Sequence, residues 1–578
     1  MTATEAGFLQ TIRESPEDDT PRLIFADWLA DQGDPERGEL IRLECELARS
    51  IGEELRPWKT VLQPRDVQCL RQREQLLGAN RQRWLGALDR SSCRVDFRHG
   101  LLRLRLDAEE LLQAGCQSAV ESGLPAWLQT LEIVGDLPLA APWLDLLAPW
   151  LDGLAHLILL SPPPPMALES LLRRPELGRL RRLEVLEPTL SVRQLASLLR
   201  CPEIEALESL SLVSTDASGE ALGWLSDHLG ECLRHLDLSH AVIANPSRAV
   251  FANLETLALA ANPLGPEGIS QLFARVEIPR LRSLNLINTG LGDAGVGVVC
   301  RQYSLQALEV LDLRRNAVGD EGAIRLASAW RLRQLRELDL GSNRIGVRGL
   351  EALGASLFLE NLRSLTLSDA ILLPEGMAAL ARGRGLVGLR VLDLEDCQIG
   401  DEGLAALTRS DNFPHLEQLI LSLNSLSRAG IHELAGSRLL AGLELLKLGE
   451  NHLDDSALAT LAVSPAGRLR LLDLALNRFG PTGVKALANS SLLRTVTSLD
   501  LSYNPVGDAG AAALAGSPWL ENLGLLRLEG SRLTQQGALA LARAPWLPNL
   551  WRLEVQHNAL GTAGTAALRD VLGYRLVC

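Results

Sequence analysis

A leucine pattern with a nearly constant period constrains this chain more than any other feature. The pattern is Leu-x-x-Leu-x-Leu-x-x-Asn, and every step between units is 27 residues except one of 26. Its first position falls at residues 254, 281, 308, 335, 362, 389, 416, 443, 469, 496, 523 and 550, with valine only at 496. A register held this long predicts stacked units that each pack only on their neighbours. The 578 residues therefore need no division into several ordinary globular cores.

Each position of the unit has a physical role. The Leu-x-Leu alternation predicts a short strand with one buried face. Asn stands eight residues after the first leucine in eight of twelve units, where its amide can satisfy backbone groups at a turn. Gly stands fourteen residues after it in eleven of twelve, because the layers approach closely there or the backbone needs glycine. An apolar residue such as Leu326 follows on a predicted helix, with Asp320 as its expected N-cap.

The same register continues toward the N-terminus with lower fidelity. Leucine stands at 101, 128, 154, 180, 207 and 233, which gives 18 units in all. The Asn position is lost in all six and holds Glu109, Asp136, Pro162, Pro188, Thr215 and Ala241. The unit at 233–253 has 21 residues, so we expect it to lack a regular helix.

These motifs resemble the ribonuclease-inhibitor type of leucine-rich repeat over roughly residues 100–578. The resemblance implies an α/β solenoid: a leucine-rich-repeat horseshoe of about 17–18 units, with parallel strands on the concave side and helices on the convex side. It says little about a ligand.

The first 50 residues follow a different pattern. A helix is predicted at 23–30, and Gly33-Asp34-Pro35 ends it and starts another, with Leu40, Leu43 and Leu47 on one face. The run 21–39 resembles a small bacterial repeat-companion domain, from which Gly38 and Leu40 depart. That family implies no activity. We expect a helical domain at 1–50, a helical connector and cap at 51–92 with a helix at 64–88, and the solenoid at 93–578, where a strand at 93–97 caps the first repeat.

Bulk properties narrow the function. A net charge of −14 disfavours binding to nucleic acid and to anionic membranes. The arginines on the 64–88 helix are expected to lie on a solvated face. Nine scattered cysteines without a CxxC pair favour a reducing compartment. No signal peptide or membrane span is visible, so a cytoplasmic monomer is expected.

No catalytic, cofactor-binding or metal site is predicted. An aspartate recurs on the concave face at 237, 312, 339, 393, 473 and 500, either as a stripe for a basic partner or as a merely soluble form of the strand. His235, Asp237 and His240 offer too few converging metal ligands. Cys397, which stands at an Asn position, has no evident base beside it.

The richest mixed patch lies on the C-terminal concave rim. It combines Tyr, Trp and Arg, the residue types that dominate interface energetics, with close carboxylates. It is either an interface or the atypical cap of a solenoid. Its residues are Asp473, Asp500, Tyr503, Arg527, Glu529, Trp551, Arg552, Glu554, Gln556 and His557.

We therefore expect a non-catalytic protein–protein interaction scaffold without a cofactor, which binds a protein, basic in character, through its concave face. Two alternatives stay open: a regulator of an enzyme such as a GTPase, by analogy of fold alone, and a structural array without one tight ligand.

Overall fold

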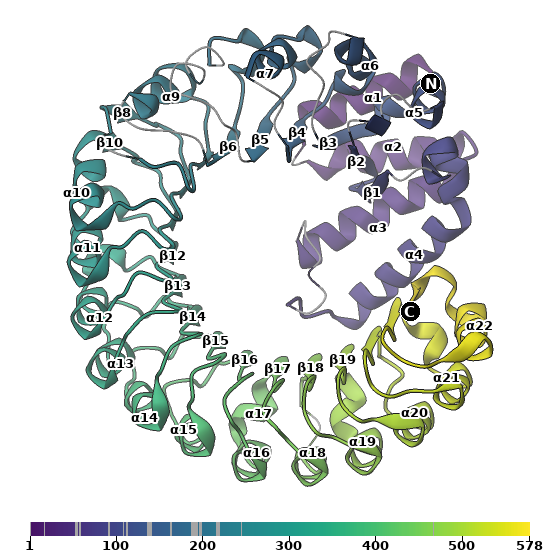
Figure 1. Cartoon of the computed structure of the whole chain (residues 1–578), viewed down its shortest axis with the longest axis vertical. Helices are drawn as coiled ribbons and strands as arrows, with labels where there is room; N and C mark the ends of the chain where they lie inside the picture. The colour runs from purple at the N-terminus through teal and green to yellow at the C-terminus, as the bar shows by residue number, and fades with distance from the viewer. Residues whose placement is uncertain are drawn as a thin grey trace. The chain divides into compact units, whose positions relative to one another are not determined.

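A computed structural model describes the chain except residues 1, 17, 53–55, 57–58, 91–92, 108, 111–113, 136–141, 162–164, 187–194, 196–198, 215–219, 244–245 and 466. The chain divides into two compact units. Unit 1 comprises Met1–Ala48 with Ala79–Asn316, and unit 2 comprises Arg49–Gly78 with Ala317–Cys578. Within each unit the strands line the inner side and the helices the outer side (Figure 1).

Four helices precede the repeats: α1 (Ala3–Glu14), α2 (Asp19–Asp31), α3 (Pro35–Ile51) and α4 (Pro64–Leu85). The predicted helices at 23–30 and 64–88 are thus present, and α1 is an addition. The sequence did signal α1, because Thr2 and Glu5 form a capping box at its start. Its side chain Phe8 stacks on Phe25 of α2 with ring centroids 5.3 Å apart.

In unit 1 these helices dock on the first repeats around Trp127. The Phe25 and Trp127 ring centroids are 5.3 Å apart, and the Glu44 carboxylate accepts a 2.8 Å hydrogen bond from the Gly100 amide. The predicted capping strand is β1 (Arg94–Arg98), which pairs antiparallel with β2. The helical region therefore covers the apolar end of the solenoid.

The parallel strands of unit 1 pair in chain order. They are β2 (Leu101–Asp107), β3 (Leu128–Val134), β4 (His156–Leu159), β5 (Arg182–Leu186), β6 (Ser209–Val213), β7 (His235–Asp237), β9 (Thr256–Ala258), β11 (Ser283–Asn285) and β12 (Val310–Asp312). Its repeat helices are α5 (Ala114–Glu121), α6 (Pro142–Leu151), α7 (Pro165–Leu172), α9 (Ala221–Leu229), α10 (Gly265–Arg275) and α11 (Gly292–Val299).

Unit 2 repeats the arrangement with greater regularity. Its strands are β13 (Glu337–Asp339), β14 (Ser364–Thr366), β15 (Val391–Asp393), β16 (Gln418–Ile420), β17 (Leu445–Lys447), β18 (Leu471–Asp473), β19 (Ser498–Asp500), β20 (Leu525–Arg527), β21 (Arg552–Glu554) and β22 (Leu576–Val577). Its helices are α12 (Asp320–Ala327), α13 (Val347–Gly354), α14 (Leu373–Arg382), α15 (Gly400–Thr408), α16 (Arg428–Ala435), α17 (Arg438–Gly442), α18 (Asp455–Ala462), α19 (Pro481–Ala488), α20 (Gly507–Ala515), α21 (Gln535–Ala542) and α22 (Gly561–Leu572). Each of the 18 predicted units has its strand, and β22 adds a final short one, so the predicted fold is confirmed.

The Asn position forms a hydrogen-bonded ladder, as its place in the pattern predicted. Asn424 is fully buried, and its Nδ2 donates to the carbonyl of Leu394 at 2.6 Å. Its Oδ1 accepts from the amides of Cys397 and Ile399 in the preceding repeat, both at 3.2 Å. Equivalent asparagines such as Asn316 and Asn451 bond in the same way. The ladder thus satisfies buried backbone groups where the chain leaves each strand.

The glycines fourteen residues after the first leucine serve close packing. A Cβ on Gly376 would lie 2.7 Å from Leu350 of the preceding repeat, and one on Gly537 would lie 2.5 Å from Asp508. Neither glycine has a positive φ. Of the two reasons that the sequence left open, the close approach of the layers therefore explains the glycine at this position.

The short unit at 233–253 has no helix among its described residues between Ala241 and Asn253, as expected. Strand β8 (Ala249–Val250) pairs parallel with β10 (Val276–Glu277) in its place, as a separate two-stranded sheet. The predicted N-cap Asp320, however, is wrong. Gly319 is the N-cap of α12, and the Asp320 carboxylate accepts from the amides of Gly346 and Gly349, at the start of the next repeat's helix, both at 2.8 Å. The anion thus stabilises the N-terminus of the neighbouring helix.

Candidate functional site

The C-terminal rim predicted from the sequence is a row of charged side chains across four adjacent strands. Asp473 lies opposite Asp500, Asp500 opposite Arg527, and Arg527 opposite Glu554 in the parallel register. Side chains at these positions point away from the leucine core. The sequence therefore placed these four groups correctly beside one another.

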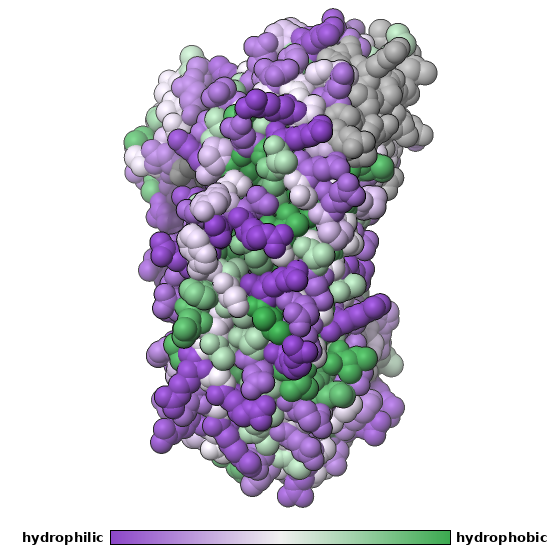
Figure 2. Space-filling view, turned by 90° about the vertical axis from the view of Figure 1, so that its left-hand side faces the viewer, coloured by the Kyte–Doolittle hydropathy of each residue, from purple (hydrophilic) through white to green (hydrophobic). Residues whose placement is uncertain are grey.

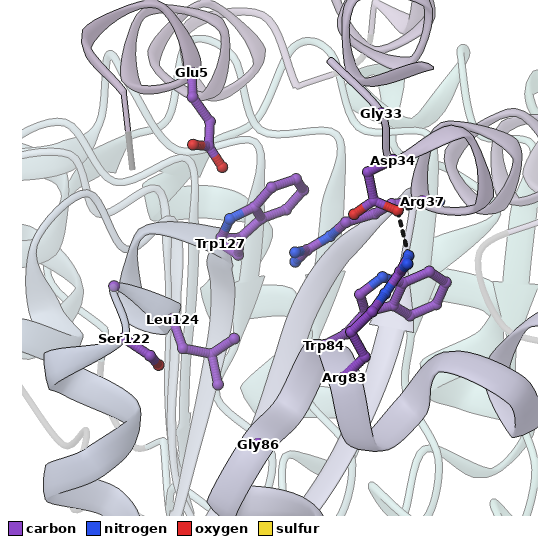
Figure 3. A pocket seen from close by; sticks show the side chains of 11 residues that line it. Glu5, Gly33, Asp34, Arg37, Arg83, Trp84, Gly86, Ser122, Leu124 and Trp127 are labelled. Atoms are coloured by element: carbon purple, nitrogen blue, oxygen red, sulfur yellow. Dashed lines mark hydrogen bonds and ion pairs between the residues drawn. The ribbon is translucent and has the colours of Figure 1, made fainter. Parts of the chain in front are cut away.

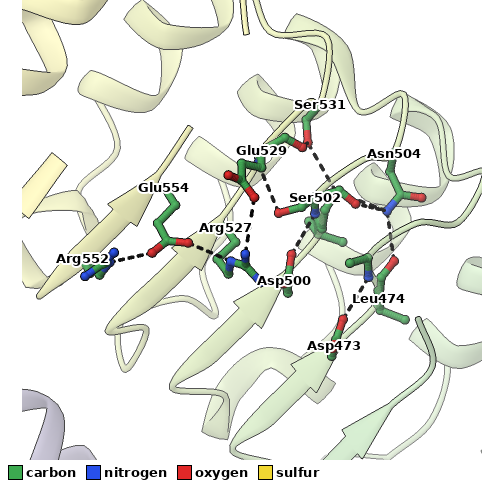
Figure 4. A network of polar contacts seen from close by, with 12 residues as sticks. Asp473, Leu474, Asp500, Ser502, Asn504, Arg527, Glu529, Ser531, Arg552 and Glu554 are labelled. Atoms are coloured by element: carbon green, nitrogen blue, oxygen red, sulfur yellow. Dashed lines mark hydrogen bonds and ion pairs between the residues drawn. The ribbon is translucent and has the colours of Figure 1, made fainter. Parts of the chain in front are cut away.

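Arg527 is the centre of an ion-pair network (Figure 4). Its guanidinium contacts the Asp500 carboxylate at 2.5 Å, Glu554 at 2.8 Å and Glu529 at 3.4 Å. Arg552 contacts the other oxygen of Glu554 at 2.6 Å. Because these carboxylates already share two cations, the network is largely neutralised within the chain and is a weaker attraction for a basic partner than its composition suggested.

Asp473 stands at the end of this row, and its carboxylate accepts the Ala475 amide at 3.0 Å. Burial, and then the negative charge of Asp500, raise the pKa of Asp473 to about 6. Asp473 and Asp500 are therefore the close pair of like charges that the sequence predicted. The charge of Asp500 is paired with Arg527, and the charge of Asp473 is balanced less completely.

Three members of the predicted patch are buried and not available to a partner, which corrects their inclusion in a predicted interface. Trp551 is 5% exposed, Asp500 8% and Glu554 3%. By contrast, Tyr503 is 44% exposed, His557 is exposed, and Glu529, Arg552 and Gln556 are partly exposed. Trp551 is thus a core residue of the last repeats and not an aromatic anchor.

Trp551 is buried within unit 2, where the chain's own linking segment, residues 59–78, packs on the last repeats. The Leu62 carbonyl accepts the Thr497 hydroxyl at 2.8 Å, and Arg71 donates to the Asn549 side chain at 3.0 Å. A Cβ on Gly524 would lie 3.0 Å from the Trp551 ring and would clash with Val67. The start of α4 therefore covers one end of β19–β21.

A second row of side chains, which the sequence interpretation missed, lies where each strand ends. Seven residues after the first leucine, every unit from 254 onward has a positive φ. We call the members of this row in unit 2 the left-handed row: Ser342, Asp369, Asp396, Leu423, Glu450, Leu476, Tyr503, Gly530 and His557. Their constant spacing from the first leucine was the signal that could have identified them.

The middle of the left-handed row alternates acidic and apolar side chains. Asp396 and Glu450 are exposed. Leu423, which lies between them in the row, is 37% exposed, and Leu476, which follows Glu450, is 46% exposed. Tyr503 follows, and its ring lies against Gly530, where a Cβ would approach it to 2.7 Å. This alternation gives a strip that can contact both charged and apolar groups.

Negative charge also gathers at β15 beside this strip. Burial is the main cause that raises the pKa of Asp393, and burial with the charge of Asp393 raises the pKa of Glu395. Both shifts indicate carboxylates that lack full compensation. The positive charges of Lys447 and Lys59 offset only part of the rise in both pKa values.

The remaining candidates have structural places. Burial raises the pKa of the Cys397 thiol to about 12, and its Sγ donates to the Leu367 carbonyl at 3.1 Å, as a member of the ladder. The described residues contain no group of three or more His, Cys, Asp or Glu that could hold a metal ion. No helix in the described part is both long and apolar enough to cross a membrane.

Comparison with known proteins gives a repeat family and distant structures. A family model described as Leucine Rich repeat matches residues 304–327, 332–354, 389–407, 469–488 and 493–515. No curated protein matches the chain. Among solved structures, an internalin (InlF) from Listeria monocytogenes is 20% identical and covers 66% of this chain and 92% of its own, with a TM-score of 0.34. The yeast Rad7 and Elc1 complex is 18% identical and covers 58% of this chain and 81% of its own, with a TM-score of 0.40. The mouse RP105/MD-1 complex is 16% identical and covers 78% of this chain and 86% of its own, with a TM-score of 0.39.

Proposed function

We propose that this chain, a leucine-rich-repeat protein, is a non-catalytic scaffold. It binds a protein partner through the concave face of its repeats. We further propose that its repeats belong to the ribonuclease-inhibitor class, that residues 1–50 are a repeat-companion domain, and that it works in the cytoplasm. The nine cysteines form no disulfide in the described part of the chain, which supports a reducing compartment.

The observation that carries the proposal is the placement of Leu423, Leu476 and Tyr503 in the left-handed row. A left-handed backbone costs a residue with a side chain about 1–2 kcal/mol, and Gly, Asn or Asp tolerates it best. Exposing an apolar side chain there gives no compensating burial within the chain. Three such residues in one strip support a surface that a partner covers.

The character of the partner follows from the charges beside this strip. Asp369, Asp396 and Glu450 are exposed, and Asp393 and Glu395 are poorly compensated. The partner is therefore a protein that presents basic and apolar side chains together. The part of the outer face that Figure 2 shows is mostly hydrophilic, with apolar side chains scattered over it.

The test is affinity capture from an extract of the source organism, followed by titration of the purified partner. A variant with Leu423→Ser, Leu476→Ser and Tyr503→Ser should lose the partner, and Tyr503→Ala alone should weaken binding by about 1–3 kcal/mol. The matched control is Leu357→Ser with Val463→Ser, because these side chains are 81% and 80% exposed outside the row.

Charge variants separate steering from contact. Asp396→Asn with Glu450→Gln should mainly slow association and reduce its dependence on salt. The proposal fails if the row variant and its control capture the same proteins with the same affinity.

A further inference from the structure

A cavity of about 410 Å³ lies within unit 1, apart from the concave face. The turn between α2 and α3 supplies Asp34 and Arg37, the end of α4 supplies Arg83 and Trp84, and the 3-10 helix η3 (Leu124–Trp127) supplies Trp127. Figure 3 shows two indole rings on opposite sides of the Arg37 guanidinium, which points into the space between them. This volume lies within the usual range for small-molecule sites, and the lining combines charged side chains with two indole rings.

The guanidinium of Arg37 is the unusual group in this cavity. Its central carbon lies 3.3 Å from the centre of the Trp127 ring, so the indole face covers one side of the cation. Its Nε and Nη2 atoms are buried and have no hydrogen-bond partner among the described residues. These two atoms form the edge of a guanidinium that presents two parallel N–H groups, the geometry that binds a carboxylate in a bidentate manner.

The acidic side chains that line the cavity are engaged elsewhere. The Asp34 carboxylate contacts Arg83 at 2.5 Å and accepts the backbone amide of Arg37 at 3.3 Å. The Glu5 carboxylate accepts the Thr2 amide at 3.3 Å in the capping box of α1. Burial lowers the pKa of Arg37 to about 10, and the charges of Asp34 and Glu5 offset only part of this decrease. The side chain is therefore still a cation at neutral pH, and its Nε and Nη2 atoms have no hydrogen-bond partner among the described residues.

We propose that this cavity binds a small organic carboxylate, with both oxygens on the Nε and Nη2 atoms of Arg37 and the flat or apolar body against Trp84 and Trp127. A single negative charge matches the one cation whose fork is free. A phosphate dianion is disfavoured because Glu5 and Asp34 also line the cavity. The inference does not depend on the proposed function of the concave face.

The carboxylate can belong to a free acid or to the C-terminus of a short peptide, and calorimetric titration of the full chain distinguishes them. The probes are benzoate, the dipeptide Gly-Phe, their amides benzamide and Gly-Phe-amide, and inorganic phosphate. At least one of the two acids should bind in a 1:1 ratio, and its amide should bind at least about tenfold more weakly, since it lacks the charge that the fork recognises. Stronger binding of benzoate assigns a free acid, and stronger binding of the dipeptide assigns a peptide terminus.

A variant pair locates the site. Arg37→Met keeps an apolar stem against Trp127 and should reduce the affinity for the bound acid by about tenfold or more. Arg42→Met is the matched control on the same helix, where the arginine pairs with Asp27 and Glu39 outside the cavity, and it should leave the affinity unchanged. The proposal is overturned if neither acid binds at millimolar concentration, if acid and amide bind equally, or if Arg37→Met binds as well as the original chain. The comparison of acid with amide needs no variant, so it decides even where Arg37→Met does not fold.

Discussion

The first repeats and the later ones hold the same leucine core in register by different backbone chemistry. Strands β2 to β6 have four to seven residues, whereas β7, β9 and β11 to β21 have three each. Most of the short strands are followed by an Asn at the ladder position, and β2 to β6 are not. Strand β7, which is followed by Ala241, is a short strand without its own Asn. Backbone groups that a longer strand would pair are thus satisfied by a side-chain amide in the later repeats.

This difference shows that a solenoid has two separate requirements, burial of apolar side chains and hydrogen bonding of the backbone, which a single consensus sequence combines. The leucines remove apolar surface from water in both regions, and the central leucine is buried in each. Register is a separate problem of hydrogen bonding, which strand length or a side-chain ladder can solve. A repeat that loses its Asn is therefore not defective if its strand is extended.

The largest expected effect tests whether the leucine core is the same in both regions. Leu157 of β4 and Leu311 of β12 are both fully buried. Truncating either to alanine should cost about 2–5 kcal/mol, through lost transfer free energy and the cavity left behind. The measurement is the shift of urea unfolding followed by circular dichroism. A much smaller loss for Leu157→Ala would show that the first repeats do not depend on this core.

The second prediction breaks the ladder. Asn424→Ala should cost about 2–4 kcal/mol, because the amides of Cys397 and Ile399 and the carbonyl of Leu394 lose their buried partner. Hydrogen exchange of those two amides should accelerate in the same variant. The control is Glu109→Ala at the equivalent place of the first repeat, where the side chain is exposed and the change should stay within about 0.5 kcal/mol.

The reverse substitution sharpens the same comparison. Ala370 occupies the ladder position without a polar side chain and is buried. Ala370→Asn restores the pattern of its neighbours and should stabilise the chain by about 1 kcal/mol, the usual net value of an intramolecular hydrogen bond. A destabilised variant would mean that the neighbouring repeats have closed over the space that the amide needs.

The sequence predicted the repeating parts well, because a local period determines them. The strands and the Asn ladder follow from spacing alone, whereas the reason for the glycine position, close packing as at Gly376, needed the structure. The placement of Trp551 did not, because its burial depends on the linking segment, whose Arg71 contacts a residue 478 positions away. The left-handed row was missed for another reason: its positions share a constant spacing from the first leucine but no residue type, so the residue pattern did not mark them.

A fourth prediction compares carboxylates of the two regions by the pH dependence of stability. The pKa of Asp473 is raised to about 6 from 3.8, so the folded chain holds this proton more tightly. Its contribution favours folding at low pH and is lost as pH rises from about 4 through 6. Asp473→Asn should therefore raise stability at pH 7 by roughly 1 kcal/mol and flatten that part of the pH profile.

The early repeats supply a contrast of opposite sign. Glu184 lies 3.0 Å from His156, which lowers the pKa of the glutamate. Its contribution is present above its usual pKa and is lost as pH falls, so Glu184→Gln should slightly lower stability at neutral pH. Urea midpoints measured from pH 3.5 to 7.5 test both signs, and parallel profiles for the two variants would contradict this assignment.

The smallest expected effect concerns Asp312, next to Leu311 on β12. Its carboxylate contacts the Arg314 guanidinium at 2.6 Å and accepts the Arg314 amide at 3.1 Å. The neighbouring position on β11 is Asn285, so there is no like charge on that side for the substitution to relieve. Because Arg314 is well exposed, solvent screens the pair, and Asp312→Ala should cost well under 1 kcal/mol. Unfolding in urea beside Leu311→Ala is the measurement, since the two changes lie in one strand. Equal losses would show that Asp312 holds the strand end as firmly as the leucine holds the core, and an acidic stripe free to meet a partner would then be excluded at this repeat.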